Sequence, residues 1–357
     1  MKQTRDARGG YRITKVLRGL ISFIFACILT VLAVLPATAT ELNSGGAAIF
    51  DPNTVYTYVS ARARAGSEPA PVVIALHGMG SEGKGFCQRF LDSAELNGWI
   101  IIAPTFRYRN WTDPVTVAED DVALTRQLVG FLDELPKRFG LRVDSRVSII
   151  GFSRGAQLAH RFALAYPERT RSIAVMSAGT YTLPVAMTQT AAGMKSMVFP
   201  YGTADLATRF RRESDPAALA QVSFWVAVGA KDNNADDVPR QWDLFQGRDR
   251  VQRARAFALS LGTLGVPVSL NIFPNVGHSM SPDMVVGATK FVTQMLKAAA
   301  TPPVMVDSPP MPSNEPMDKV IVQPPVPIVP QTGGIAAGAP SGGFIGVFDW
   351  LGILRRT

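Results

Sequence analysis

The sequence predicts an α/β fold in which a mostly parallel sheet is covered by helices on both faces. Between about residues 49 and 300, apolar runs of strand length alternate with segments whose apolar residues recur at helical spacing. Several apolar runs lack alternating polar residues, which is typical of strands buried on both faces. A hydrophobic content of 47 % over 357 residues is enough to build a large core.

The strands and helices follow from these runs in chain order. We expect strands at 72–76, 99–103, 147–152, 172–178, 223–230 and 268–273. One predicted helix, near 117–135, places on one face Leu124, Leu128, Phe131 and Leu135. A second, near 248–262, does so with Val251, Ala254, Phe257 and Leu261. The last helix begins after Ser281, a capping residue, and its expected core face is Met284, Ala288, Phe291 and Met295.

Residues 1–39 have the three parts of an export signal. A basic start is followed by an apolar run at 20–35 and by small residues at Ala37 and Ala39. We therefore expect cleavage after Ala39 and export to the periplasm or the cell exterior. Because the uncharged stretch continues to residue 40, an uncleaved membrane anchor is the alternative.

The composition changes at residue 301. Of the 26 prolines, 11 lie between 301 and 340, which predicts an extended, disordered linker over 301–342. The tail at 343–357 is mostly apolar up to residue 354, and two arginines follow. The eleven residues 344–354 would reach only about 16 Å as a helix, too short for a bilayer. Surface association with a membrane, docking on a partner and folding back onto the domain are the alternatives for this tail. Residues 40–300 remain as one folded domain, which we expect to be a monomer.

The charge distribution argues against nucleic acid as a partner. Residues 1–39 hold six basic residues against one acidic residue, so most of the net charge of +8 lies there. The weak field of the remainder includes no basic run interleaved with aromatic residues. Cleavage would leave Cys87 as the last cysteine, which excludes an intramolecular disulfide. The acidic loop after residue 232 lacks the glycine of a calcium loop, so no calcium or other metal site is expected there.

The segment "GFSRG" at 151–155 carries the clearest chemical signal. It follows an apolar strand and precedes a stretch of helical period, which is the strand–turn–helix context of a G-x-S-x-G elbow. Serine becomes an effective nucleophile when a base takes its proton, an acid orients that base and N–H donors await the oxyanion. We expect Ser153 to be this nucleophile, and a plain glycine turn is the alternative.

The base follows by elimination because the chain has three histidines. His160 lies seven residues beyond Ser153 on the same predicted helix, about 10 Å along its axis, and cannot reach the hydroxyl. His77 lies in a glycine-rich loop that is better suited to supplying backbone donors. His278 directly follows the last predicted strand, and loops at the carboxyl ends of parallel strands converge on one edge. His278 is therefore the predicted base.

The orienting acid has several candidates. Asp232 ends a predicted strand and gives the chain order Ser, Asp, His that a hydrolase elbow predicts. Asp205 is the alternative, followed by Asp236 and Asp237.

The oxyanion donors are expected to be the backbone N–H groups of Met79 and Arg154. The Arg154 side chain is expected either to pair with a nearby carboxylate or to meet an anionic substrate group. Aromatic Trp111 and Trp242, in the loops 107–114 and 240–247, are candidates for the substrate pocket or the core, and His77 is a further pocket candidate.

These motifs resemble those of the α/β-hydrolase superfamily over about residues 49–300. The segments that carry the resemblance are "LHGMG", "GFSRGAQLAHRFALAYPER", "VGAKD" and "NVGHS". Within the superfamily, the chain resembles secreted esterases related to polyhydroxybutyrate depolymerase and feruloyl esterase. The resemblance implies an eight-stranded, mostly parallel sheet and cofactor-free ester hydrolysis through an acyl-enzyme. It implies these roles: nucleophile Ser153, acid Asp232, base His278 and oxyanion loop His77-Gly78-Met79.

Two functions of different classes follow. The first is an exported serine hydrolase that cleaves a small-molecule or oligomeric carboxylic ester; an amidase or peptidase would use the same acyl-enzyme chemistry. Paired cysteines and a polymer-binding domain are not recognisable in the sequence, unlike in secreted depolymerases. The second is a catalytically idle envelope protein that presents its arm and tail to a partner or membrane.

Overall fold

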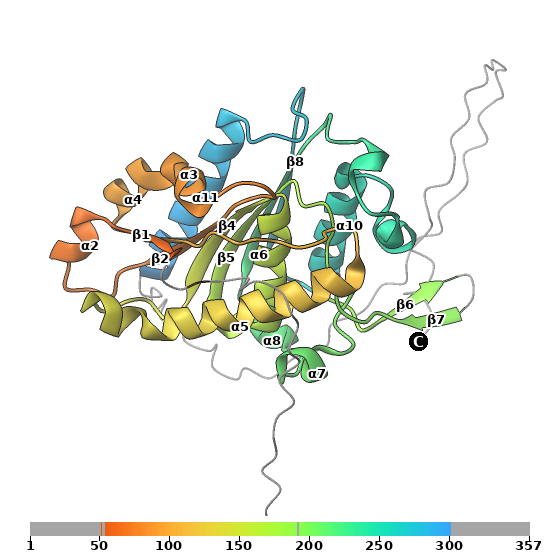
Figure 1. Cartoon of the computed structure of the whole chain (residues 1–357), viewed down its shortest axis with the longest axis horizontal. Coiled ribbons are helices and arrows are strands. Elements are labelled where there is room, and N and C mark those ends of the chain that lie inside the picture. The colour runs from red at the N-terminus through yellow and green to blue at the C-terminus, as the bar shows by residue number, and fades with distance from the viewer. Residues whose placement is uncertain (1–50, 52–53, 191–192, 301–357) are drawn as a thin grey trace, which may run out of the picture. The chain divides into compact units, whose positions relative to one another are not determined.

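The computed structural model describes residues 51, 54–190 and 193–300, and these residues build the predicted α/β fold. A seven-stranded sheet has the order β1-β3-β2-β4-β5-β8-β9 (Figure 1). Its strands are β1 (Tyr56–Val59), β3 (Ile100–Ala103), β2 (Val72–Leu76), β4 (Val147–Phe152), β5 (Thr170–Met176), β8 (Ser223–Gly229) and β9 (Val268–Phe273). All neighbouring pairs are parallel except β1 with β3.

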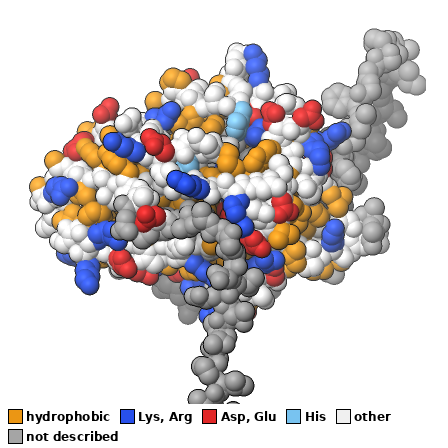
Figure 2. All heavy atoms as spheres, viewed as in Figure 1, with side chains coloured by type: hydrophobic (Ala, Val, Ile, Leu, Met, Phe, Trp, Pro, Cys, Tyr) orange, Lys and Arg blue, Asp and Glu red, His pale blue; other side chains and the backbone are white. Residues whose placement is uncertain are grey.

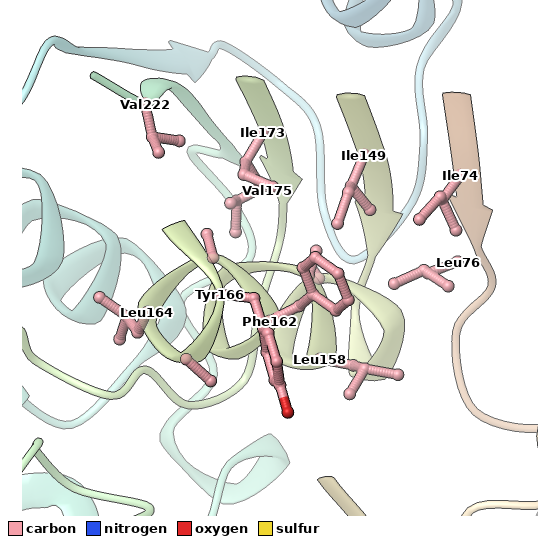
Figure 3. Close-up of a cluster of buried hydrophobic side chains, with 14 of the residues drawn as sticks. Ile74, Leu76, Ile149, Leu158, Phe162, Leu164, Tyr166, Ile173, Val175 and Val222 are labelled. Atoms are coloured by element: carbon pink, nitrogen blue, oxygen red, sulfur yellow. The ribbon is translucent and has the colours of Figure 1, made fainter. Parts of the chain in front are cut away.

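Helices cover the two faces of this sheet. One face packs against α5 (Pro114–Phe139), α6 (Arg154–Ala165) and α10 (Arg250–Thr263). The other packs against α3 (Gly83–Cys87), α4 (Leu91–Asn97) and α11 (Pro282–Ala300). Figure 3 shows part of the first layer, where strand residues such as Ile149 and Ile173 lie beside Phe162 of α6. Burial of both faces explains why the central strands read as continuous apolar runs.

The remaining elements are short. They are α2 (Ala61–Ala65), α7 (Leu206–Phe210), α8 (Pro216–Leu219), α9 (Asp243–Gln246), the hairpin β6 (Met187–Thr190) and β7 (Gly193–Ser196), and the 3-10 turns η2 (Gln88–Phe90), η3 (Pro167–Arg169), η4 (Ala235–Asp237) and η5 (Arg240–Trp242). The β6–β7 hairpin forms a separate two-stranded sheet.

The six predicted strands are confirmed within two residues at each end. The described residues provide seven strands of the main sheet, one fewer than the resemblance implies. The additional strand β1 and the β6–β7 hairpin were not expected. Their residues are half-buried or exposed, so they lack the buried apolar run that marks the central strands.

Helix α5 is longer than the expected 117–135. It begins at Pro114 after the cap Asp113, whose carboxylate accepts from the N–H groups of Val115 and Thr116. It ends before Gly140, which adopts a left-handed conformation with φ of 63°.

Helix α11 begins as expected, with the Ser281 hydroxyl accepting from the N–H of Met284. Its buried row differs from the expected one: Met284 and Ala288 are in the core, but Val292 and Leu296 complete the row in place of Phe291 and Met295. The row follows the i, i+4 ridge, which is inclined to the helix axis, so the contact drifts around the helix.

Three predicted segments lie outside the described residues: the export signal 1–39, the linker 301–342 and the tail 343–357. Among the helices that the structure describes, none has the length and apolarity needed to cross a membrane. On the face shown in Figure 2, basic and acidic side chains are interspersed. Cys87 is fully buried, and burial raises the pKa of its thiol to about 11.

Candidate active site

Ser153 lies at a strained turn between β4 and α6. Its backbone has φ of 52° and ψ of −116°, a conformation that non-glycine residues rarely adopt and that costs about 1–3 kcal/mol. Gly155 makes the turn feasible, because a Cβ there would lie 2.1 Å from the Leu76 carbonyl oxygen of the adjacent strand β2. The strand–turn–helix context predicted from the sequence is thus present.

Three side chains from distant parts of the chain form one hydrogen-bonded series at the carboxyl edge of the sheet. The Ser153 Oγ lies 2.9 Å from His278 Nε2. The His278 Nδ1 lies 2.8 Å from Asp232 Oδ2. The imidazole is about one-third exposed, whereas the Asp232 carboxylate is almost fully buried. The nucleophile, base and acid candidates are therefore in contact in the order that proton transfer requires.

The loops after β8 and β9 hold the base against the acid. The Lys231 N–H donates to the Val276 carbonyl oxygen at 2.8 Å, which ties the two loops together. Gly229 permits this approach, since a Cβ there would lie 2.2 Å from the same oxygen. The His278 ring also stacks on Phe152, with ring centroids 5.2 Å apart. The backbone contact between the two loops and the stacking on Phe152 together hold the imidazole in place.

Arg250 also contacts the candidate acid, and no sequence pattern predicts this contact. Its Nη1 donates to Asp232 Oδ1 at 3.0 Å, so the carboxylate is held by His278 on one oxygen and by Arg250 on the other. The Arg250 Nη2 donates to the Asp237 carbonyl oxygen. The residue starts helix α10, 18 positions after Asp232, in a segment with no motif that could have marked it.

The predicted oxyanion donors flank the serine. Met79 and Arg154 both line the cavity that contains Ser153 and His278. Neither backbone N–H donates to an acceptor within the part of the chain that the structure describes. Gly78 brings the first loop close, because a Cβ at that position would lie 3.2 Å from Ser153 Cβ. Two N–H groups are thus free to bind an oxyanion at the serine.

The Arg154 side chain forms an ion pair, one of its two expected roles. Its Nη2 donates to Asp121 Oδ1 at 2.6 Å, and its guanidinium lies over the Tyr108 ring at 4.6 Å. Asp121 also accepts from Arg161 at 2.5 Å, and the three charged side chains are buried. Burial lowers the pKa of Arg161 to about 10, which leaves it charged at neutral pH.

The cavity beside Ser153 has a volume of about 310 Å³ and is partly open. Trp111 lines it, as one alternative in the sequence analysis predicted. Trp242 does not: it is fully buried, and its indole N–H donates to the Tyr181 carbonyl oxygen at 3.2 Å. The prediction of a pocket role for Trp242 is therefore wrong, because its ring fills the core against Tyr201.

The pocket role of His77 is also wrong. This ring is fully buried, its Nε2 accepts from the Phe106 N–H at 2.9 Å, and its Nδ1 donates to the Gly78 carbonyl oxygen at 2.7 Å. Burial lowers the pKa of His77, so the neutral ring is favoured. Its structural effect is to tie the Gly78–Met79 loop to the segment at Phe106.

His160 lies in the core, away from the serine. Its Nδ1 donates to the Ala156 carbonyl oxygen, and its Nε2 accepts from the Thr182 N–H at 2.9 Å. Burial, with a smaller contribution from Arg161, lowers the pKa of His160 well below its ordinary value.

The alternative acid Asp205 belongs to a different cluster. Its carboxylate accepts from the Phe199 N–H at 2.6 Å and from Arg209 at 2.9 Å. Asp236 and Asp237 lie in the turn η4. Of the four acidic candidates, Asp232 is the one that contacts His278.

The strand order, the helices on both faces and the strained turn between β4 and α6 define an α/β-hydrolase fold. No protein-family model and no curated protein matches the sequence.

Solved structures with similarity to the chain include three hydrolases. One is poly(aspartic acid) hydrolase-1 from Sphingomonas sp. KT-1, with 19 % identity over 67 % of this chain and 91 % of the other, at a TM-score of 0.49. Another is LpqC, a poly(3-hydroxybutyrate) depolymerase from Bordetella parapertussis, with 21 % identity over 70 % and 87 % at 0.47. The third is the Bacillus cereus carboxylesterase, with 16 % identity over 68 % and 93 % at 0.44.

Proposed function

We propose that this protein is a serine hydrolase that cleaves carboxylic esters through an acyl-enzyme on Ser153. The observation that carries the proposal is the unbroken series from Ser153 Oγ through His278 to Asp232, with contacts of 2.9 and 2.8 Å. The strained turn and the two free N–H groups beside it provide the other parts that acyl transfer needs.

Acylation begins when the Ser153 oxygen attacks the ester carbonyl carbon. His278 Nε2 takes the hydroxyl proton as the new C–O bond forms, and the carbonyl oxygen becomes an oxyanion bound by the N–H groups of Met79 and Arg154. Asp232 accepts a hydrogen bond from the Nδ1–H group of His278 and stabilises the imidazolium. Collapse of the oxyanion breaks the bond to the alcohol oxygen, which leaves with the proton from His278.

Deacylation repeats these steps with water in place of the serine. His278 takes a proton from the water as its oxygen attacks the acyl carbon, and the same two N–H groups bind the second oxyanion. The proton then returns to Ser153 Oγ as the carboxylic acid is released. No step requires a metal ion or an organic cofactor.

A serine-reactive phosphonate tests this proposal. We expect covalent labelling of the wild type and none of Ser153→Ala, with the adduct on the peptide that contains residue 153. Cys87→Ala is the matched control, because it removes another small nucleophilic atom, which is buried and does not line the cavity, and should leave labelling intact. A folded wild type that does not label would contradict the proposal and favour a catalytically idle envelope protein.

The proposed substrates are small or oligomeric esters, in preference to amides. Esters have the better leaving group, whereas the hydrogen-bonded series would serve both classes. Turnover of an ester and of its matched amide by the purified protein separates the two classes. Faster cleavage of the amide would change the assignment to an amidase or peptidase.

We propose that the protein is exported and acts as a monomer in the periplasm or outside the cell. The basic, apolar and small-residue parts of 1–39 support this location. The mass of the protein recovered from cell fractions tests it, with a new N-terminus at residue 40 as the expected result. An intact N-terminus in the membrane fraction would instead indicate an anchor.

A further inference from the structure

Two buried side-chain donors meet at one corner of the cavity beside Ser153. Gly179, Gln157 and Arg250 all line this cavity. The position that a Cβ of Gly179 would occupy lies 3.1 Å from Gln157 Nε2 and 3.9 Å from Arg250 Nε. We name this part of the cavity, formed by these three residues, the donor corner.

The Arg250 Nε in the donor corner has no hydrogen-bond acceptor among the described residues. The residue is 7 % exposed, and its two terminal nitrogens already donate to Asp232 and to the Asp237 carbonyl oxygen. Its Nε is buried without an acceptor in the part of the chain that the structure describes. A buried N–H that lacks an acceptor is destabilising, and a ligand oxygen would provide that acceptor.

The Gln157 amide presents its NH₂ group, and not its oxygen, to the corner. Its Oε1 accepts from the Thr180 hydroxyl at 3.0 Å, and that hydroxyl accepts in turn from Arg161 Nη2 at 2.8 Å. Arg161 Nη1 also approaches Gln157 Oε1 at 3.5 Å. The Arg161 guanidinium can only donate, so the amide oxygen of Gln157 must face it. The two N–H groups on Nε2 therefore remain as donors at the cavity.

The charges around the cavity favour an anion. The carboxylate Asp121 is shared by two buried guanidiniums, Arg154 and Arg161, whereas Asp232 pairs with Arg250. These five groups together carry one positive charge in excess. No acidic side chain lines the described cavity.

We propose that the substrate carries a carboxylate group, which binds in the donor corner to Gln157 Nε2 and Arg250 Nε. The inference rests on the proposed hydrolase function and specifies its substrate class. A carboxylate has two oxygens that can each accept one of the two donors. The substrate class is thus an ester that has a free carboxylate on its acyl part or on its alcohol part.

Two matched pairs of esters test the preference and locate the carboxylate. The acyl arm compares the 4-nitrophenyl monoester of glutaric acid with 4-nitrophenyl pentanoate. The alcohol arm compares 4-acetoxybenzoate with its methyl ester. We expect kcat/KM to be at least about tenfold higher for the anionic member of one pair, the scale of a charge-assisted hydrogen bond.

Variants connect this preference to the donor corner. Gln157→Glu replaces a donor by an anion, and Gly179→Ala places a methyl group between the two donors. Each should reduce the ratio of kcat/KM for the anionic over the neutral ester at least about tenfold. Gln189→Glu, on the exposed β6 strand, makes the same charge change elsewhere and should leave the ratio unchanged. The ratio of the two kcat/KM values is used because any effect of a variant on folding or on the nucleophile changes both values equally and cancels.

The outcomes separate this inference from the proposed function. Hydrolysis of the neutral esters with no anionic preference in either arm would overturn the carboxylate inference and leave the serine hydrolase standing. A preference that survives both Gln157→Glu and Gly179→Ala would overturn the assignment to the donor corner. Failure to cleave any ester, together with no phosphonate labelling, would remove the proposed function itself.

Discussion

Replacement of Asp232 by asparagine tests how the site orients its base. In the native site, Asp232 Oδ1 accepts from Arg250 Nη1 and Oδ2 accepts from His278 Nδ1. Arg250 can only donate, so the asparagine oxygen would face Arg250 and its NH₂ group would face His278. The imidazole would then have to accept at Nδ1 and carry its proton on Nε2.

That tautomer cannot take the proton of Ser153. Loss of the correct tautomer at a Ser-His-Asp triad lowers kcat by about 10⁴, and we expect a loss of this order for Asp232→Asn. At about 1.36 kcal/mol for each factor of ten, the transition state is destabilised by about 5 kcal/mol.

The assay is the steady-state hydrolysis of 4-nitrophenyl acetate at pH 8. Asp205→Asn is the matched control, since Asp205 contacts Phe199 and Arg209 and not His278. It should lose some stability but keep its kcat. A loss of less than about tenfold in Asp232→Asn, or an equal loss in Asp205→Asn, would refute the assignment of the acid.

Three further predictions concern the turn, a buried histidine and the arm. Gly155→Ala should lower the free energy of unfolding by about 3 kcal/mol or more, because its methyl group would collide with the Leu76 carbonyl oxygen. Gly130→Ala has open space around it and should raise the free energy of unfolding by up to about 1 kcal/mol, since alanine has the higher helix propensity. Urea unfolding measures both, and equal effects would contradict the packing of the turn. The pKa of His160 is lowered in the folded state, so the unfolded state binds its proton first as pH falls below about 6.5. This group should therefore lower the free energy of unfolding by up to about 1.4 kcal/mol for each unit that the pH falls. The variant His160→Gln, which can keep one donor and one acceptor, should reduce this pH dependence. An unchanged pH dependence would refute the buried neutral ring. Deletion of 301–357 should leave kcat/KM for a soluble ester within about twofold, and loss of turnover would show that the arm contributes to the site.

The sequence predicted the parts of the fold whose physical cause is local. Buried parallel strands are apolar throughout, so β2, β4 and β8 could be recognised from their residues alone. The edge strand β1 and the β6–β7 hairpin could not, since their half-exposed residues carry little periodic signal. In α11, the core row depends on the angle at which the helix crosses its neighbours, which the sequence does not encode locally.

The same distinction applies to the candidate site. Ser153 and His278 could be predicted as candidates from the sequence, because the motif around the serine and the position of the histidine after the last strand are local features. The burial of Trp242 and His77 depends on packing between loops distant in sequence, so their core roles could not be separated from pocket roles. The role of Arg250 could not be predicted, because its contact with Asp232 forms only when α10 packs beside β8.

The proposed acyl-enzyme can be observed directly. Rapid mixing of the wild type with 4-nitrophenyl acetate, an acid quench and peptide mass spectrometry would show where the acyl group is attached. We predict a burst of nitrophenol and an added acetyl group on the peptide that contains Ser153, with neither in Ser153→Ala. An acetyl group on another residue, or a burst that persists in Ser153→Ala, would contradict the assignment of the nucleophile.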